Sequence, residues 1–276
     1  MCLLAFSGCS SSGNKQSTAP QTTEEPYPEA NPASDFEYSV AKSDKNAIVI
    51  TKYIGEAKDV VIPQKIDNTP VVSIYYAAFF KSDITSVVMP DSVKYVLDYA
   101  FELCKNLTRV EFGKNTIYIG MDAFRGCSAL SEAVLPPRLE RIEAEAFYEC
   151  TSLKSIFIPK TIKKIKDEAF SGCSSVTELN IEDGVTDLMG YAIFAGCKSL
   201  KEVTIPSSVV SFSGTSVFGA CPALEKIIFL GNAPTFVSGR DPLGPLNNNV
   251  KIYYDSKTKG WDTTSLKDYY TLVEMD

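Results

Sequence analysis

The most reactive side chains of this sequence are its cysteines. The chain has 276 residues and eight cysteines. Six of them occupy one position of a repeated pattern: Cys104, Cys127, Cys150, Cys173, Cys197 and Cys221. Thiols at regular spacing could form disulfide bonds, bind a metal ion or fill a core as small apolar side chains.

An even number of cysteines in an exported protein ordinarily indicates disulfide bonds. Distance alone would not forbid them between neighbouring coils, since disulfide Cα separations begin near about 4.4 Å. However, Ser82 takes the place of cysteine in the first copy of the pattern, as expected for a small buried side chain. Single cysteines one repeat apart also lack the close ligand pairs of a zinc site. We therefore expect free, buried thiols and no metal ion.

The sequence contains no histidine. This absence excludes the Ser-His-Asp and Cys-His catalytic groups and the His-Glu-x-x-His zinc motif. Acidic pairs such as Glu143 with Glu145 and Asp167 with Glu168 are present, but we interpret them as solvated surface. Residues 239–244, GRDPLG, read as a turn-rich loop and not as a nucleotide-binding motif. We expect no enzymatic activity and no cofactor.

Composition is typical of an acidic protein with one extended core. Hydrophobic residues make up 45% of the chain and the formal net charge is −7. The densest basic cluster, Lys163, Lys164 and Lys166, is followed at once by Asp167 and Glu168, so nucleic acid is not an expected partner. The sequence has no apolar run of about 18 residues, the length that a transmembrane helix requires.

The cysteines must be positioned by a repeat that is built around a phenylalanine. Seven phenylalanines follow one another at spacings of 22 to 24 residues: Phe79, Phe101, Phe124, Phe147, Phe170, Phe194 and Phe218. A fixed period in this range predicts a solenoid, in which each coil buries its apolar face against its neighbours. We expect these phenylalanines to be buried.

One copy, residues 147–165, shows the unit of the repeat most clearly. Leu153, Ile156 and Ile158 have the Leu-x-x-Ile-x-Ile spacing of a leucine-rich repeat strand. Pro159 should end that strand, because proline has no amide hydrogen for the ladder. We predict one unbroken parallel ladder of such strands, with a short return segment and a tight turn in each coil.

The whole pattern, A-F-x-x-C-x-x-L-x-x-I-x-I-P-x-x-V-x-x-I, resembles the BspA-like (Treponema-type) leucine-rich repeat family. The resemblance implies a mainly β fold: a leucine-rich repeat solenoid of seven 22–24-residue repeats with a parallel strand ladder, few or no long helices, and a cap at each end. The family is a broad group of bacterial surface proteins, a few of which bind host matrix proteins or other cells. The resemblance therefore also implies a surface protein that binds a macromolecule.

The first residues indicate export. Residues 1–9, MCLLAFSGC, resemble the end of a lipoprotein signal peptide, with Cys9 as the residue that would be acylated. The alternative is an unprocessed, disordered amino terminus. If Cys9 is acylated, the protein is lipid-anchored at the bacterial cell surface and tethered to its membrane, and we expect a monomer.

We divide the rest of the chain into four parts. Residues 10–35 are rich in Ser, Thr, Pro and Glu and predict a disordered tether. Residues 36–71 are expected to form an amino-terminal β cap. The solenoid is expected over residues 72–230, and a carboxy-terminal capping module over residues 231–276.

One row of strand residues predicted to face solvent is apolar in its amino-terminal half. The row nearest the proline corner is Val61, Val88, Glu111, Val134, Phe157, Asn180, Thr204 and Ile228. A parallel polar row flanks it. Apolar anchors within a polar rim are typical of protein-binding surfaces. We therefore predict a binding site formed by Val88, Arg109, Glu111, Glu132, Val134 and Phe157.

Two other interpretations remain at this stage. Valine and phenylalanine in the outward row could reflect only β-propensity and packing along the sheet. For the whole protein, we expect a binding or adhesion module that recognises a host matrix or cell-surface protein or glycan. The alternative is a structural or envelope-scaffold lipoprotein that has no soluble ligand.

Overall fold

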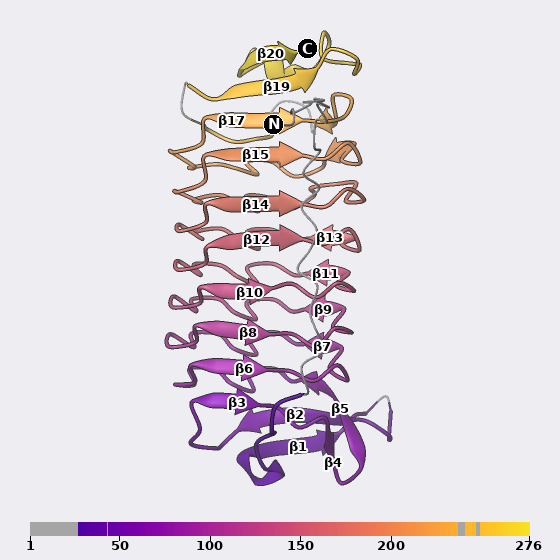
Figure 1. Cartoon of the computed structure of the whole chain (residues 1–276), viewed down its shortest axis with the longest axis vertical. Helices are drawn as coiled ribbons and strands as arrows, with labels where there is room; N and C mark the ends of the chain where they lie inside the picture. The colour runs from indigo at the N-terminus through magenta and orange to yellow at the C-terminus, as the bar shows by residue number, and fades with distance from the viewer. Residues whose placement is uncertain (1–26, 43, 237–240, 247–248) are drawn as a thin grey trace, which may run out of the picture.

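The alternation of apolar and polar residues in each repeat produces one short strand per coil. In the computed structural model, which describes residues 27–42, 44–236, 241–246 and 249–276, these strands stack along one axis and form a β-solenoid (Figure 1). The main strands are β3 (Asp59–Val61), β6 (Ser86–Val88), β8 (Arg109–Glu111), β10 (Glu132–Val134), β12 (Ser155–Ile158), β14 (Glu178–Ile181), β15 (Glu202–Ile205), β17 (Lys226–Phe229), β19 (Lys251–Asp255) and β20 (Thr271–Met275). The predicted solenoid is confirmed.

The main strands pair in parallel with equivalent residues aligned, as Val61 is with Val88 and Val88 with Glu111. The predicted parallel ladder is therefore present, but it is not unbroken. It is divided into three hydrogen-bonded sets: β3 to β10, β12 with β14, and β15 to β20. At the first break Ala133 supplies the smallest of the inward side chains and is only half-buried. The second break falls at the first coil of 24 residues, between Phe170 and Phe194.

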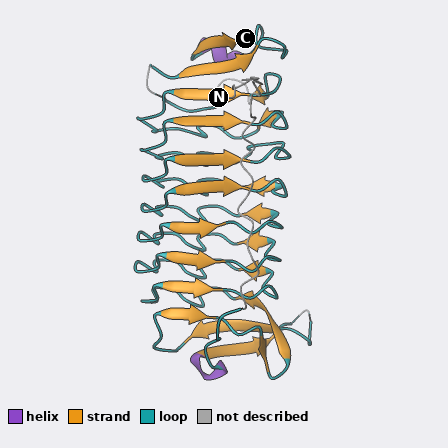
Figure 2. Cartoon of the chain, in the orientation of Figure 1, coloured by secondary structure: helices purple, strands orange, loops and turns teal. Residues whose placement is uncertain are grey.

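Short return strands run along a second side of the coils (Figure 2). They are β7 (Tyr95–Val96), β9 (Tyr118–Ile119), β11 (Arg141–Ile142), β13 (Lys164–Ile165), β16 (Ser211–Phe212) and β18 (Thr235–Phe236). Each of them points one apolar side chain into the core, and all six of these inward residues are buried or half-buried. The return strands therefore close the core opposite the main strands.

Additional strands cover the amino-terminal end of the core. β1 (Phe36–Val40) pairs antiparallel with β2 (Ile48–Tyr53), and β4 (Lys65–Ile66) pairs antiparallel with β5 (Thr69–Ile74). β2 and β5 then continue in parallel into the sheet of return strands. Buried Phe36 and Ile50 join the core of the solenoid from these strands.

Residues 27–35 pack against the solenoid, although they were predicted to belong to the disordered tether. The Asn31 N–H donates to the Val61 carbonyl at 2.9 Å, and the Val61 N–H donates to Asn31 Oδ1 at 2.8 Å. The 3-10 helix η1 (Ala33–Asp35) then leads directly into β1. Because β3 is the edge strand of its sheet, its backbone groups need partners, and Asn31 supplies them. Residues 27–35 are thus packed, while residues 10–26 lie outside the described residues.

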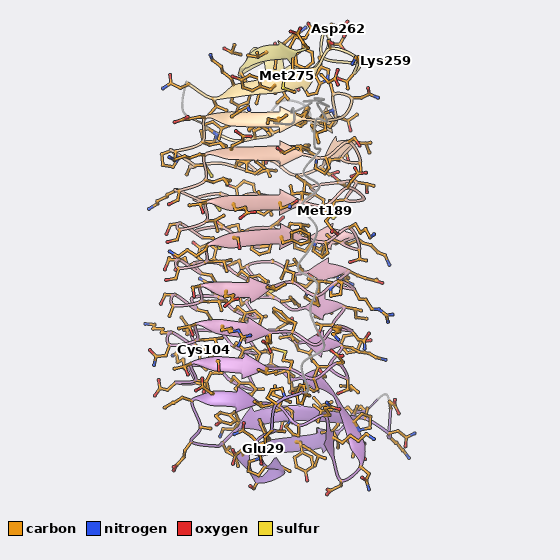
Figure 3. All side chains as sticks on the ribbon, in the orientation of Figure 1. Glu29, Cys104, Met189, Lys259, Asp262 and Met275 are labelled. Carbon is orange, nitrogen blue, oxygen red and sulfur yellow. The ribbon has the colours of Figure 1, made fainter. Side chains whose placement is uncertain are left out.

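At the carboxy-terminal end, β19 and β20 extend the last set of main strands. The 3-10 helix η2 (Ser265–Asp268) lies between them in sequence and buries Leu266. Trp261 is also buried, with its ring 4.8 Å from that of Tyr254. Glu29 and Met275 mark the two opposite ends of the rod in Figure 3. In the described part of the chain, η1 and η2 are the only helices.

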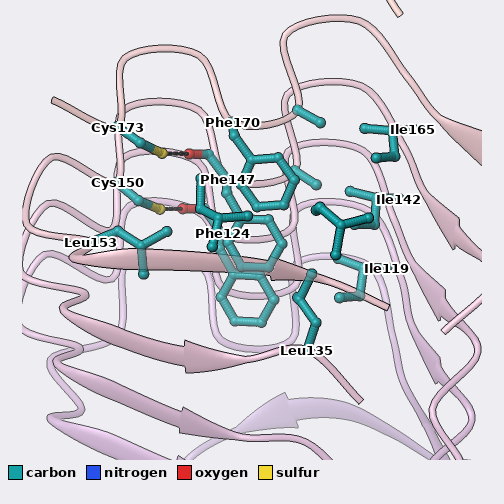
Figure 4. Packing of buried hydrophobic residues seen from close by; sticks show 14 of the residues in the cluster. Ile119, Phe124, Leu135, Ile142, Phe147, Cys150, Leu153, Ile165, Phe170 and Cys173 are labelled. Carbon is teal, nitrogen blue, oxygen red and sulfur yellow. Dashed lines mark hydrogen bonds between the residues drawn. The ribbon is translucent and has the colours of Figure 1, made fainter. Parts of the chain in front are cut away.

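A stack of aromatic rings runs through the core. The seven repeat phenylalanines are at most 1% exposed, which confirms their predicted burial. Successive rings lie 4.6 to 5.7 Å apart with interplanar angles of 2 to 18°. Figure 4 shows the rings of Phe124, Phe147 and Phe170 one above another. Aromatic pairs at such distances stabilise a core by about 0.5 to 1.5 kcal/mol beyond their burial.

Each phenylalanine sits in a turn with an unusual backbone. Around Phe147, Glu145 and Glu149 both have φ of 56°, in the left-handed region. This conformation costs about 1 to 2 kcal/mol for a residue other than glycine. Hydrogen bonds to the next coil offset that cost: the Glu145 N–H donates to Asp167 O and the Glu149 N–H to Ser171 O, both at 2.9 Å. The turns therefore form a backbone ladder of their own.

The six repeat cysteines are free and buried, which confirms the prediction from the sequence. Each Sγ donates a hydrogen bond to the carbonyl of the phenylalanine in the preceding coil. For Cys150 and Cys173 the sulfur to oxygen distances are 3.2 and 3.3 Å, and both bonds are visible in Figure 4. Burial raises the pKa of Cys173 to about 12 and that of Cys221 to about 11. These two thiols are therefore neutral donors at physiological pH.

The aromatic stack predicts the effect of truncating one ring. Phe147→Ala should lower the free energy of unfolding by about 3 to 5 kcal/mol, because it removes a fully buried aromatic side chain. Urea unfolding followed by circular dichroism measures the change. Phe80→Ala is the matched control, since Phe80 is 43% exposed and its loss should cost less than about 1 kcal/mol. Equal stability of the Phe147 variant and the parent would contradict a core role for the stack.

The thiol ladder makes a second prediction. A Cys2→Ser, Cys9→Ser chain, denatured without reductant, should titrate with six free thiols, and the folded form should react slowly because the sulfurs are buried. A titre of two or fewer would mean that the coils are cross-linked. The ordinary thiol pKa is 9.0 and the folded values of Cys173 and Cys221 are higher, so their contribution to stability is present below about pH 9 and is lost as the pH rises toward 11 to 12.

Candidate functional site

The main strands present two outward rows of side chains, which together we call the strand face. Alternate residues of a strand point to opposite sides of the sheet. In β8, for example, Val110 is buried, whereas Arg109 and Glu111 on either side of it point outward. The pairing places Glu111 between Val88 of β6 and Val134 of β10. The order of the outward row thus agrees with the order read from the sequence.

Charged residues predicted for the site lie together at the centre of its amino-terminal half. Arg109 forms an ion pair with Glu111 on its own strand. Arg109 Nε also lies 3.9 Å from Glu132 Oε2 on the next strand. All three side chains are substantially exposed, so these ion pairs add little to stability. They are available to a ligand.

The apolar residues predicted for the site differ in exposure. Val134 is 67% exposed, the largest fraction among the exposed large hydrophobic residues of the described chain. Val88 and Phe157 are half-buried. Val88, Glu111 and Val134 lie on consecutive paired strands, whereas Phe157 lies on β12, beyond the first break in the ladder. The two coils remain joined there by a hydrogen bond from Lys154 N–H to Ser131 O at 3.4 Å.

Tyr27 lies beside the amino-terminal end of this surface. Its hydroxyl donates to the Ile62 carbonyl at 2.6 Å and reaches the Val88 carbonyl at 3.4 Å. Burial raises the pKa of Tyr27, with smaller contributions from Asp91 and Glu111, so the phenol stays protonated as a donor. This contact was not foreseen, because the residues around Tyr27 have the composition of a disordered tether. The open part of the apolar row therefore begins beyond Val88.

The outward apolar row also continues beyond Ile228, the last residue predicted for it. Ile228 aligns with Tyr253 in β19, and Tyr253 aligns with Val273 in β20. Lys226 Nζ lies 5.1 Å from the centroid of the Tyr253 ring and 3.5 Å from Glu202. In the sequence, the only signal for this extension is the alternation of residue types at 250–254, a segment predicted to belong to the carboxy-terminal capping module. Polar Asn180 and Thr204 separate this second apolar segment from Phe157.

Within the described ranges, no cluster of three or more His, Cys, Asp or Glu side chains could hold a metal ion. No helix among those residues has the length and apolar character needed to cross a membrane. Cys9, the predicted lipidation site, lies outside the described residues. The described site residues therefore offer exposed ion pairs and apolar side chains, which suit binding.

The solenoid, its repeated core positions and its strand face define a leucine-rich repeat protein. The chain matches the family described as "BspA type Leucine rich repeat region" over residues 72–193 and 187–238, with six copies. The matched residues cover more than half of the chain, so the chain belongs to the BspA-type leucine-rich repeat family. The phenylalanine spacing counts one copy more, seven in all.

Solved structures of bacterial proteins have the same fold. A leucine rich repeat protein of T. pallidum is 31% identical, with 71% of this chain and 91% of that chain covered and a TM-score of 0.65. A leucine-rich repeat protein from Bacteroides ovatus is 23% identical, with 87% and 75% covered and a TM-score of 0.56. A leucine rich cell surface protein from Faecalibacterium prausnitzii is 20% identical, with 90% and 95% covered and a TM-score of 0.54. At these lower identities the last two show the fold alone. No curated protein is significantly similar to this chain.

Proposed function

We propose that this protein is a non-catalytic binding or adhesion protein of the bacterial cell surface, and that it recognises a macromolecule through the strand face. The observation that carries the proposal is Val134, an apolar side chain that is 67% exposed beside the ion-paired Arg109 and Glu132. An apolar anchor next to charged groups is the arrangement by which protein surfaces bind partners. Membership of a repeat family that is typical of surface and interaction proteins supports it.

Each site residue has a role in the proposal. Val134 and Phe157 are the apolar anchors, because their side chains face solvent on neighbouring coils. Arg109, Glu111 and Glu132 set specificity through charge. Val88 contributes at the edge, where Tyr27 already covers part of the surface. A protein partner is favoured over a glycan here, since large apolar anchors stabilise protein interfaces.

Location is the second part of the proposal. We infer that the protein is exported and anchored through a lipid on Cys9, with the segment after Cys9 serving as a tether. The lipobox-like residues 6–9 support this, and so does the description of the Faecalibacterium prausnitzii protein as a cell surface protein. The alternative is a scaffold of the cell envelope, in which the rod spaces other components and no soluble ligand binds.

Binding through the strand face is tested with the full chain carrying Cys2→Ser and Cys9→Ser, screened against purified matrix proteins and mucins by surface plasmon resonance. Phe157→Asp should weaken the affinity for any ligand at least tenfold without unfolding the rod, because loss of an apolar anchor typically costs about 1 to 3 kcal/mol. Thr204→Asp, at the same outward position two coils farther along and beyond the second break in the ladder, is the matched control and should bind like the parent. If the Phe157 variant binds like the parent, the strand-face site is wrong. If no ligand binds at micromolar concentration, the scaffold is the better interpretation.

Lipidation is tested separately in the native bacterium. Cells grown with a labelled fatty acid should incorporate the label into this protein, and Cys9→Ala should abolish the incorporation, because acylation requires the cysteine thiol. Cys104→Ala serves as the control, since Cys104 is buried in the core. Label that persists in the Cys9 variant would refute the anchor.

A further inference from the structure

Exposed and half-buried tyrosines gather, together with exposed Met121, on the first coils, away from the strand face. They lie on the return strands and in the turns that follow them, and we call them the tyrosine patch: Tyr75, Tyr76, Tyr95, Tyr99, Tyr118 and Met121. Tyr76 is 57% exposed and Tyr95 is 40% exposed. The patch brings five tyrosines within 44 residues together on three adjoining coils. Solvated aromatic surface of this kind marks a binding site.

Contacts between coils join the patch into one surface. The rings of Tyr76 and Tyr99 lie edge to face at 5.2 Å. The Tyr99 hydroxyl donates to Met121 Sδ at 3.8 Å, and the Met121 N–H donates to Asp98 Oδ1 at 2.9 Å. Each of these contacts links residues from neighbouring coils, so the solenoid itself brings the patch together.

The second half of the patch adjoins Asp98. Tyr95 and Tyr118 are aligned partners in β7 and β9. Burial raises the pKa of the Tyr118 phenol, and the charges of Asp98 and Glu143 raise it further. Asp98 therefore lies close to this phenol. Asp98 therefore connects Tyr118 with Met121 and Tyr99. Tyr76 with Tyr99, and Tyr95 with Tyr118, thus form two pairs that run from one coil to the next.

Some of the charges around the patch form ion pairs. Arg125 Nη1 lies 3.2 Å from Asp122 Oδ1, and Glu143 forms an ion pair with Arg141. Arg141 in turn lies 5.6 Å from the centroid of the Tyr118 ring. Asp98, at the centre of the patch, is bound by the Met121 N–H and not by a base within the described residues, so the patch favours a neutral ligand over an acidic one. A neutral ligand with many hydroxyl groups suits it, because carboxylates accept hydrogen bonds and phenol hydroxyls both donate and accept them.

We propose that the tyrosine patch is a second binding site, which takes a neutral polysaccharide along the rod axis. The face of an aromatic ring carries negative charge density and attracts the weakly positive C–H bonds of a sugar ring. Coils repeat every 4.8 Å or so, as neighbouring strands do, and this spacing is close to the length of one pyranose unit. A linear glycan can therefore meet one tyrosine in each coil.

The test is affinity electrophoresis of the full Cys2→Ser, Cys9→Ser chain in native gels that contain one neutral polysaccharide each: β-glucan, galactomannan, arabinoxylan or amylopectin. At least one should retard the protein in a concentration-dependent way, and heparin should not. The combined change Tyr76→Ala and Tyr99→Asn should weaken the affinity for the retarding polysaccharide at least tenfold. Asparagine is chosen at Tyr99 because that residue has φ of 61°, which asparagine tolerates.

Two controls make the result specific. Tyr191→Ala removes a tyrosine that is 50% exposed but lies outside the patch, and it should be retarded like the parent. Phe157→Asp should also be retarded like the parent, so that failure of the strand-face proposal and failure of this one are distinguished. Melting temperatures equal to that of the parent show that the variants fold. If none of the four polysaccharides retards the chain, or if the Tyr76 and Tyr99 variant is retarded like the parent, the proposal is overturned.

Discussion

The structure depends on one constraint: each coil can bury its apolar side chains only against the coils above and below it. Side chains of similar character must therefore stack along the rod axis. The phenylalanine rings do so at 4.6 to 5.7 Å, and each thiol meets the phenylalanine carbonyl of the coil before it. Within this arrangement each inward position holds a narrow range of mostly apolar side chains. The outward positions are then free to vary from coil to coil, as Glu111, Val134 and Phe157 do at one position of the strand face.

Much of this core could be predicted from the sequence, because residues that recur at the same place in every repeat are those that point into the core. The period of the phenylalanines, the serine at position 82 and the alternation in each strand were enough to identify the solenoid, the buried thiols and the outward rows. Left-handed residues such as Glu145 and Glu149 could not be predicted, because glycine usually marks that conformation and both are glutamates. Their conformation depends on hydrogen bonds to another coil, which a local sequence pattern does not report.

Contacts specific to one place in the rod were also missed. Asn31 and Tyr27 lie in a segment of tether-like composition, yet both pair with backbone groups at the edge of β3 and the coil after it. The tyrosine patch was missed for a related reason. Its members occupy different positions within their repeats, so no single column of the repeat shows them together. The strand face and the tyrosine patch thus lie on different sides of the rod. The strand face could be predicted from one repeated position of the sequence, whereas the tyrosine patch is found only in the folded structure.

The division of the main ladder into three hydrogen-bonded sets has a mechanical consequence. A parallel ladder resists bending because every backbone bond in it must lengthen together. Where β10 meets β12, and where β14 meets β15, that resistance is reduced, while the aromatic stack continues past both places. The rod should therefore bend most easily at these two places, where the turn hydrogen bonds and, at the first, the pairing of β11 with β13 still join the coils. Under shear, Val134 and Phe157 would then move relative to each other, because the first of these places lies between them.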